Sequence, residues 1–333
     1  MTPRMSPSIT PRIDGHLDLA YLALQGVDLE SSSTDRGRFG VNFPALQQGQ
    51  VRLACATLFT QLGSEDPWGY PVNDDGTQAA RAARLQLRIY QGLEARGVVR
   101  IVRNRSDLAE WSSGPLRIVL LMEGADPIQS PQDAAWWFEQ GVRMVGLTWA
   151  LGSRWAGGNG ADGPLTSAGR DLVQAFDAIG ILHDASHLSR NAFDGLMQTT
   201  ERCVVASHSN SATLTGDLPR HLTDSQLKSI AQRNGVAGLN LCGAFLAQGR
   251  PATLADAVAH VLHVRSIAGP HAIAMGSDFD GGFTPLECPI GIQRPEEWPS
   301  LDAALTAAGL SEPELAGFQC ANWLRVLRSA LPA

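Results

Sequence analysis

The chain has 333 residues, of which 44% are hydrophobic and 18% are charged. This length suffices for one large domain or two ordinary ones, and the composition is that of a globular protein with ample material for a core. The net charge of −7 and the pI near 5.6 argue against nucleic-acid binding, which needs a surface with excess positive charge.

The sequence also argues against membrane insertion and secretion. The N-terminal segment contains Arg4 and Arg12 but no apolar run of signal-peptide length between them, and no later segment has the uninterrupted apolar stretch of a membrane span. The cysteines are widely spaced without a C-x-x-C pair, so we expect reduced, structural thiols and a cytoplasmic protein. They are Cys55, Cys203, Cys242, Cys288 and Cys320.

Short apolar runs recur along the chain, each followed by a longer polar or amphipathic stretch. The runs are apolar at consecutive positions, which is typical of parallel strands covered on both faces. We expect strands at Ile13–Leu19, Val51–Phe59, Leu116–Met122, Val142–Leu147, Gly180–Ala185, Cys203–Ser207, Val236–Leu241 and Ala272–Gly276.

Helical patterns lie between most of these runs. The helix beginning at Asp224 is the best defined, because Thr223 is a suitable N-cap and Gln226, three residues later, completes a capping box. We expect helices at Gln78–Arg96, Ser167–Ile179, Asn191–Thr199, Asp224–Arg233 and Ala255–Ile267, and long loops at Ala20–Gln50, Gly63–Asp75 and Gly281–Ser300.

The alternation of strand and helix predicts an α/β fold, a (β/α)₈ TIM barrel. The rival is an open, doubly wound sheet, which usually carries a Gly-rich phosphate loop after its first strand; here Ile13 is followed by DGHLD. Without an internal repeat or a low-complexity linker, residues 1–333 are predicted to form a single domain. Its barrel core would span about 12–280 and a C-terminal helical extension about 300–330.

Polar side chains follow the apolar runs at the point where the expected strands end. In a barrel of this kind the C-terminal strand ends meet at one rim, which is where catalytic groups converge. We therefore expect these side chains to lie close together: His16 and Asp18 at the end of the first strand, Glu123 at the end of the third, His187 after the fifth, His208 after the sixth and Asp278 after the eighth.

These residue types and their spacing predict a metal centre with two ions. His16 and Asp18 are two positions apart on a strand, so both side chains point the same way and can bind one ion. The carboxylate of Glu123 can bridge two ions, and the imidazoles of His187 and His208 complete the second. Imidazole and carboxylate together suit Zn²⁺, with three protein ligands per ion and room for water.

Two neighbouring ions would activate a shared water molecule, and Asp278 is placed to accept its proton. The remaining histidines are predicted to be structural. His183 is expected deeper in the barrel, and His260 and His263, three residues apart, on the outer face of a helix.

Ten segments resemble successive blocks of the membrane (renal) dipeptidase family, which are zinc metallopeptidases of the amidohydrolase-like superfamily. The blocks occur in the family's order from near residue 13 to near residue 328: IDGHLDL, LLMEGAD, GVRMVGLTW, LTSAGRDLV, DASHLS, SHSNS, LPRHLTDSQL, GVAGLNL, GSDFDG and NWLRVL. The resemblance implies a TIM barrel of the metal-dependent hydrolase type with two zinc ions per chain. His16 and Asp18 would bind the first, Glu123 would bridge both, and His187 and His208 would bind the second.

The resemblance also implies an activity. Family members cleave dipeptides, often with a D residue at the C-terminal position, by attack of a hydroxide that bridges both ions, and some open β-lactam rings. Asp278 corresponds to the aspartate that serves as general base and also binds substrate. Arg220, in LPRHL, corresponds to the arginine that pairs with the substrate's carboxylate, and a homodimer is implied as well.

The chain departs from the family pattern at two positions. Dipeptidases of the family carry a histidine after the fourth strand that polarises the scissile carbonyl, whereas this chain has Trp149, whose indole offers one N–H donor and no charge. After the seventh strand, Asn240 is followed by Leu241 and Cys242 in place of an aromatic pair. Both positions are predicted to contact substrate, so both bear on dipeptide specificity.

Three hypotheses follow. The first is a zinc-dependent dipeptidase whose substrates include L,D-dipeptides. The second is a binuclear metal amidohydrolase that cleaves a lactam or another amide, which Trp149 and Cys242 motivate. The third is a metal-binding homologue without catalytic activity.

Overall fold

A computed structural model describes residues 10–32 and 35–333 of the chain. Arg4 and most of the segment that bears on a signal peptide lie outside these residues. In the described part, none of the helices combines the length and the apolar composition that a membrane crossing requires.

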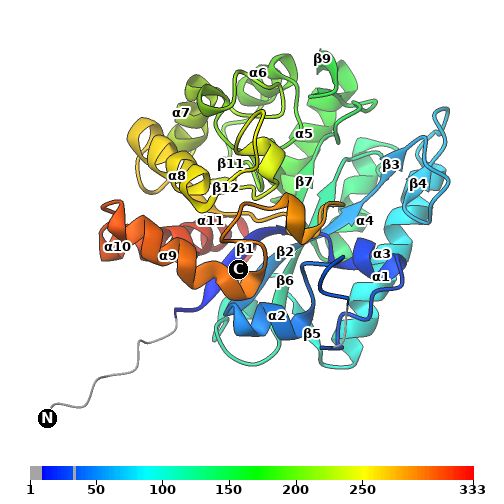
Figure 1. The fold of residues 1–333 in the computed structure, drawn as a ribbon. Coiled ribbons are helices and arrows are strands. Elements are labelled where there is room, and N and C mark those ends of the chain that lie inside the picture. The colour runs from blue at the N-terminus through cyan, green and yellow to red at the C-terminus, as the bar shows by residue number, and fades with distance from the viewer. Residues whose placement is uncertain (1–9, 33–34) are drawn as a thin grey trace, which may run out of the picture.

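Parallel strands form the centre of the molecule (Figure 1). Six of them pair side by side in the order β1-β2-β6-β7-β10-β11, the short strand β5 (Val99–Ile101) also pairs with β6, and β12 pairs with β13. The barrel strands are β1 (Arg12–Leu17), β2 (Val51–Phe59), β6 (Leu116–Glu123), β7 (Val142–Gly146), β10 (Leu182–Asp184), β11 (Val204–Val205), β12 (Ala237–Leu239) and β13 (Ile273–Met275).

Two weaker connections close the sheet into a barrel. Ala206, just after β11, forms a parallel bridge with Ala237 in β12. Between β13 and β1, the backbone N–H of Asp278 donates to the carbonyl of His16 at 3.2 Å. The hydroxyl of Ser277 also donates to the carboxylate of Asp14 in β1 at 2.5 Å. The first and last strands therefore meet beside the predicted metal ligands.

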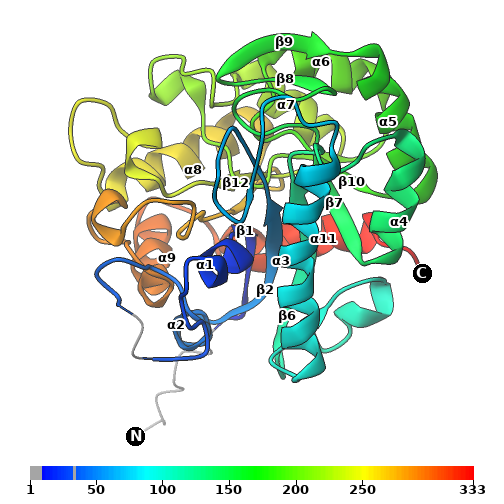
Figure 2. The same ribbon diagram turned by 90° about the vertical axis from the view of Figure 1, so that its right-hand side faces the viewer.

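Helices surround the strands (Figures 1 and 2). The Thr223 capping box is present, with the Gln226 N–H donating to the Thr223 hydroxyl at 3.3 Å. The helices are α1 (Leu19–Leu24), α2 (Phe43–Gln48), α3 (Thr77–Ala95), α4 (Ala134–Glu139), α5 (Ser167–Ile179), α6 (Arg190–Thr199), α7 (Asp224–Gln232), α8 (Leu254–Ala268), α9 (Trp298–Ala307), α10 (Glu312–Ala316) and α11 (Asn322–Ala330). The loops contain two short two-stranded sheets. One pairs β3 (Gln61–Leu62) with β4 (Gly69–Tyr70), and the other pairs β8 (Ala156–Gly158) with β9 (Ala161–Leu165).

The barrel strands bury alternate side chains in two separate cores. In β2, for example, Ala54 and Leu58 belong to the core beneath the helices, whereas Leu53 and Cys55 belong to the core inside the barrel. This alternation follows from the two-residue period of a strand. Because both faces are covered, both sets of positions must be apolar, which explains the unbroken apolar runs in the sequence.

Helix α11 fills the end of the barrel opposite the C-terminal rim. Its residues Trp323 and Leu327 join the inner core, and the Trp323 indole N–H donates to the Met275 carbonyl at 2.7 Å. The indole packs so closely on β1 that a Cβ atom at Gly15 would lie 2.3 Å from its Cζ2 atom. The predicted C-terminal helical extension is thus part of the packing of the barrel.

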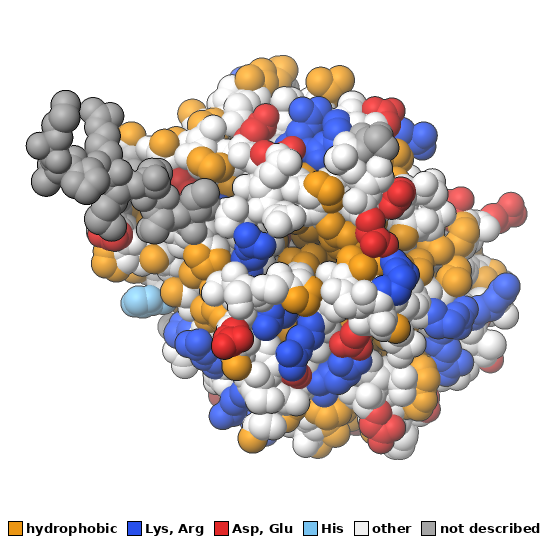
Figure 3. Space-filling model, turned by 90° about the horizontal axis from the view of Figure 1, so that it is seen from below, with side chains coloured by type: hydrophobic (Ala, Val, Ile, Leu, Met, Phe, Trp, Pro, Cys, Tyr) orange, Lys and Arg blue, Asp and Glu red, His pale blue; other side chains and the backbone are white. Residues whose placement is uncertain are grey.

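Charges of both signs share the surface. On the face shown in Figure 3, Lys and Arg side chains stand among Asp, Glu and hydrophobic side chains rather than in one continuous basic area.

Candidate metal centre and substrate pocket

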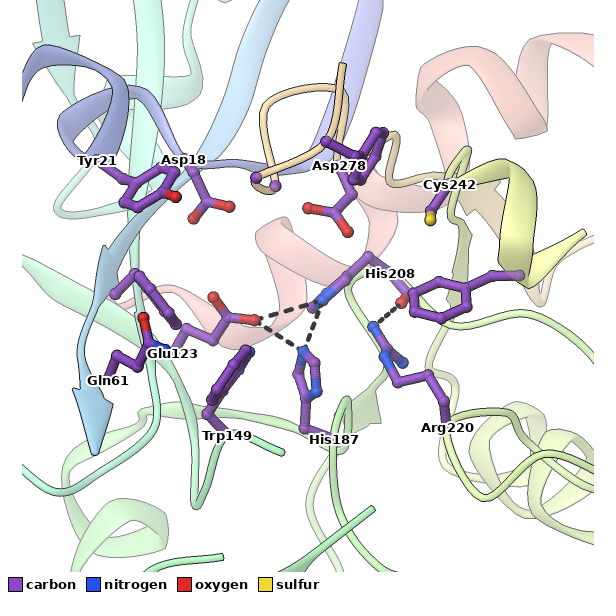
Figure 4. A pocket seen from close by; sticks show the side chains of 15 residues that line it. Asp18, Tyr21, Gln61, Glu123, Trp149, His187, His208, Arg220, Cys242 and Asp278 are labelled. Atoms are coloured by element: carbon purple, nitrogen blue, oxygen red, sulfur yellow. Dashed lines mark hydrogen bonds and ion pairs between the residues drawn. The ribbon is translucent and has the colours of Figure 1, made fainter. Parts of the chain in front are cut away.

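A cavity of about 370 Å³ opens at the C-terminal rim of the barrel (Figure 4). The predicted site residues Asp18, Glu123, His187, His208, Arg220, Asp278 and Trp149 all line it. His16, inside β1, does not line the cavity but lies directly beneath these residues and is fully buried. The structure therefore brings all eight residues to one place.

His16 lies at the centre of the acidic side chains. Its Nε2 atom is 3.8 Å from Asp18 Oδ2, 3.7 Å from Glu123 Oε2 and 4.0 Å from Asp278 Oδ1. Two groups of side chains each place their potential ligand atoms within 4.8 Å of one another. The first group is His16, Glu123 and His208, and the second is His16, Asp18 and Asp278. These separations are suitable for ions between the side chains.

Glu123 spans the two halves of the cluster. Its Oε2 atom faces His16, whereas its Oε1 atom lies 2.9 Å from His187 Nε2 and 3.4 Å from His208 Nε2. Figure 4 shows the two imidazoles converging on this carboxylate. A carboxylate that presents one oxygen to each side is the geometry that a bridging ligand needs.

The donor set fits a metal. The Nε2 atom of His16 is buried without a hydrogen-bond partner among the described residues. The Nδ1 atom of His187 lies 3.0 Å from Asn159 Oδ1, an acceptor, so it carries the proton and leaves Nε2 with a lone pair. That lone pair faces the His208 Nε2 atom at 3.0 Å. Buried polar atoms without partners are costly, and a cation would satisfy them.

Burial shifts the pKa values of the cluster in the direction that disfavours charge. It raises the pKa of Asp18 to about 7, against the effect of a hydrogen bond from Thr57, and raises the pKa of Glu123 well above its usual value. It lowers the pKa of His16 to about 3. A bound divalent cation reverses this logic for the carboxyl groups and favours ionised carboxylates beside neutral imidazoles.

Asp278 is held in place by its backbone and by Asn240. Its φ of 59° is in the left-handed region, as is the 66° of His187, and non-glycine residues there cost about 1–3 kcal/mol. The Asn240 amide donates to Asp278 Oδ2 at 2.8 Å, which leaves Oδ1 turned toward His16. Burial, followed by the charge of Asp18, raises the pKa of Asp278 to about 8.

Arg220 is a buried cation on the opposite wall of the cavity from Asp18 (Figure 4). It donates to the His208 carbonyl at 2.7 Å and to the Ser209 hydroxyl at 2.8 Å, and its guanidinium lies 5.5 Å from the centre of the Phe245 ring. Its Nε–H has no partner within the described structure. Burial lowers the pKa of Arg220 from its high ordinary value, and the charges of Asp278 and Glu123 oppose that effect.

Aromatic rings form much of the remaining cavity wall. Trp149, just after β7, packs edge-on against Phe59 at 5.3 Å and lies 6.0 Å from the His187 ring. Tyr21 also packs edge-on against Phe59, at 5.7 Å. Cys242 is on the wall nearest Asp278. The two positions that depart from the family pattern therefore both face the cavity.

Several buried polar residues beneath the cluster were missed at the sequence level. Asp14 accepts from the backbone N–H groups of His16 and Ser277, and Asp184 accepts from the backbone and side chain of Ser207. Both carboxylate oxygens of Asp280 are buried, and burial raises its pKa against the effect of a hydrogen bond from the Asp18 backbone. The sequence feature that could have identified these residues is a polar side chain within or directly beside an apolar strand.

Two of the positions expected for the other histidines were wrong. His183 does not point into the barrel, because its Nε2 atom lies 2.7 Å from Asp177 Oδ1 in the surrounding helix α5. His260 is not on an outer face, since it is buried and accepts from the Ser211 backbone N–H at 3.2 Å. All five cysteines are free.

Comparisons with known proteins agree on a family. Residues 7–331 match the membrane dipeptidase family (peptidase family M19). An uncharacterised protein from the pqqA 5′ region of Klebsiella pneumoniae is 33% identical over 260 residues, which cover 73% of this chain and 94% of that protein.

Two solved structures share the fold over nearly the whole chain. Dipeptidase AC, a metallopeptidase of family M19, is 27% identical with a TM-score of 0.86, and the match covers 98% of this chain and 100% of that one. A metallopeptidase from Rhodobacter sphaeroides, solved with a phosphinate mimic of the dipeptide L-Ala-D-Ala, is 26% identical with a TM-score of 0.85, covering 96% and 99%.

The match to the family extends over almost the entire chain, and the clustered, buried imidazoles and carboxylates could hold metal ions. The TIM-barrel-like fold is the one found in the related peptidases. The chain belongs to the membrane dipeptidase family of metallopeptidases, and it is a hydrolase.

Proposed function

We propose that this protein is a zinc-dependent dipeptidase that hydrolyses the peptide bond of small dipeptides, including those with a D residue at the C-terminal position. One observation carries the proposal: the Nε2 atoms of His16, His187 and His208 converge on the carboxylate of Glu123 at the floor of a cavity. The dipeptide mimic bound by the Rhodobacter sphaeroides relative supports the substrate class.

The chain would hold two zinc ions. His16 and Asp18 would bind the first, His187 and His208 the second, and Glu123 would bridge both. Two zinc ions held there would lower the pKa of a water molecule between them and polarise a carbonyl oxygen. Three protein ligands per ion leave room for that water and for substrate.

The remaining residues bind substrate and move the proton. Asp278 Oδ1 faces the cluster, so Asp278 would accept the proton of the attacking water and pass it to the departing amine. Arg220 would pair with the substrate's carboxylate, because its Nε–H has no partner among the residues described and a guanidinium fork matches a carboxylate. The Trp149 indole would contact the scissile part of the substrate from the aromatic wall.

Three broader features belong to the same proposal. Residues 1–333 would act as one metallohydrolase domain, since α11 is packed into the barrel core. The free cysteines suit a reducing, cytoplasmic setting. A homodimer remains the expected assembly, which size-exclusion chromatography with light scattering would test.

The test is hydrolysis of a panel of L,L- and L,D-dipeptides by protein of measured zinc content. We expect two zinc ions per chain, loss of hydrolysis on chelation and its return with Zn²⁺. Metal-replete protein that leaves the whole panel intact would exclude a simple dipeptidase.

A second candidate is a binuclear amidohydrolase acting on a lactam or another amide. Trp149 and Cys242 motivate it, because both lie on the cavity wall at positions where the family pattern changes. Hydrolysis of such amides without hydrolysis of dipeptides would favour it. A metal content well below two ions per chain, without turnover, would instead indicate a non-catalytic homologue.

A further inference from the structure

Ser207 lies at the junction between the two imidazoles that come from different strands. It immediately precedes His208, after β11, and is fully buried. Its Oγ atom is 2.8 Å from His208 Nδ1, 3.2 Å from His16 Nδ1 and 2.5 Å from Asp184 Oδ2. A fourth neighbour, the Ser186 hydroxyl, is the most distant at 3.3 Å.

The hydrogen-bonding capacity of a hydroxyl fixes the direction of these contacts. A serine hydroxyl has one proton and two lone pairs. Its proton goes to Asp184, because that contact is the shortest and a carboxylate is a strong acceptor. The two lone pairs then accept the Nδ1–H groups of His16 and His208.

The backbone around Ser207 keeps this junction in position. A Cβ atom at Gly238 would lie 1.9 Å from the Ser207 carbonyl oxygen, and one at Gly276 would lie 1.8 Å from it. Asp184 Oδ1 also accepts the Ser207 backbone N–H at 2.9 Å. The hydroxyl is therefore presented to both rings from a rigid segment.

We propose that Ser207 is a positioning residue that sets the tautomers of His16 and His208 together. With both Nδ1 atoms protonated, both Nε2 lone pairs point into the cluster. Under the proposed function, on which this inference rests, these imidazoles bind different ions, so one hydroxyl supports both metal positions.

The chain contains a matched control for this role. Ser277 immediately precedes Asp278 and binds Asp14 in the way that Ser207 binds Asp184: its N–H donates to one carboxylate oxygen at 2.8 Å and its hydroxyl to the other at 2.5 Å. Ser277 is equally buried, but the hydrogen bonds of its hydroxyl include none to an imidazole among the described residues. Ser277→Ala thus removes an equivalent serine–aspartate hydrogen bond without removing a contact to an imidazole.

The first measurement is Zn²⁺ affinity, determined by competition with a chelator for the wild-type protein, Ser207→Ala and Ser277→Ala. Loss of an outer hydrogen-bond partner of a metal ligand typically weakens metal affinity about 10- to 100-fold. We expect losses of that size at both ion positions for Ser207→Ala, and a change of less than threefold for Ser277→Ala on the same scale. Ser207→Thr, which keeps the hydroxyl, should restore much of the affinity.

The second measurement is independent of metal and of activity. Nitrogen-15 NMR of the metal-free protein distinguishes Nδ1–H from Nε2–H imidazoles. We expect two histidines to leave the Nδ1–H form in Ser207→Ala and none in Ser277→Ala. Unchanged tautomers, or equal zinc affinities for the two alanine variants, would overturn the role of Ser207. Failure of the wild-type protein to bind zinc or to hydrolyse dipeptides would instead overturn the proposed function.

Discussion

Three imidazoles and a carboxylate approach one another at the barrel rim although each is at least nine-tenths buried. In this setting charge is costly, which is why burial raises the pKa of Asp278 to about 8 and lowers that of His16 to about 3. Divalent cations would stabilise the ionised carboxylates and free Asp278 to act as a base near neutral pH.

Replacing Asp278, the proposed general base, is the first test of the site. Asp278→Asn keeps the shape of the side chain but removes its capacity to accept a proton. We expect kcat for dipeptides to fall by about 10²- to 10⁴-fold, with zinc content unchanged. Elemental analysis and steady-state kinetics on the same sample measure both, and a variant that retains wild-type kcat would exclude Asp278 as the base.

Trp149 provides a second test, in which a substitution is expected to increase kcat. An imidazole hydrogen-bonds a developing oxyanion more strongly than an indole, and one such donor is typically worth about 10²- to 10³-fold in rate. Trp149→His should therefore raise kcat for dipeptides if these are the substrates, with Trp149→Phe as the control that keeps a ring without a donor. A fall in dipeptide hydrolysis with a histidine at this position would favour a different amide as the natural substrate.

Strands and helices were predicted well where one pattern dominates. The run Val51–Phe59 and the helix Ser167–Ile179 were predicted with the observed bounds, because the first is mostly apolar and the second has a clear apolar face. His260 was misplaced because α8 has apolar residues around most of its surface, so the spacing does not say which face is buried.

The site was predictable at the strand ends and not beneath them. His16 and Glu123 stand out as polar residues that end apolar runs, and barrel topology brings such ends together. The roles of Asp14 and Ser207 depend on partners from other strands, at distances in sequence that no local pattern reveals.

Helix α11 allows a prediction about stability. Trp323 is fully buried between α11 and β1, so Trp323→Ala should cost about 3–5 kcal/mol in the free energy of unfolding. The control is Trp136→Ala in α4, where the side chain is 38% exposed and its loss should cost less than about 2 kcal/mol. Urea denaturation measures both, and equal costs would mean that α11 does not contribute to the core.

At the scale of the whole molecule, the buried acids connect stability to pH and metal. A carboxyl group whose pKa is raised by folding stabilises the protein below its unfolded pKa, and this contribution is lost as pH rises through the folded pKa. Burial raises the pKa of Asp18 to about 7 and that of Asp278 to about 8. The buried histidines affect stability in the opposite direction. Because burial lowers their pKa values, they destabilise the fold only below about pH 6.5.

Between about pH 6.5 and pH 8, we expect only the buried carboxyl groups to make stability depend on pH. There the melting temperature of the chelated protein should fall as pH rises, whereas that of the zinc-loaded protein should stay nearly constant. Differential scanning calorimetry at several pH values tests this. A chelated protein that becomes more stable across this range would contradict the assigned environments of Asp18 and Asp278.

The junction of β13 and β1 gives the site a further consequence. In the described structure this seam is joined by one backbone hydrogen bond, from Asp278 to His16, and by the Ser277–Asp14 pair. The proposed ligands of the first zinc ion, His16 and Asp18, stand beside it, so an ion bound there would hold the two edges of the barrel together. When zinc is scarce, the seam would lose this support, and its opening would expose extended chain to proteases. Unloaded copies would then be degraded ahead of loaded ones, which would match the amount of enzyme in a cell to the metal available.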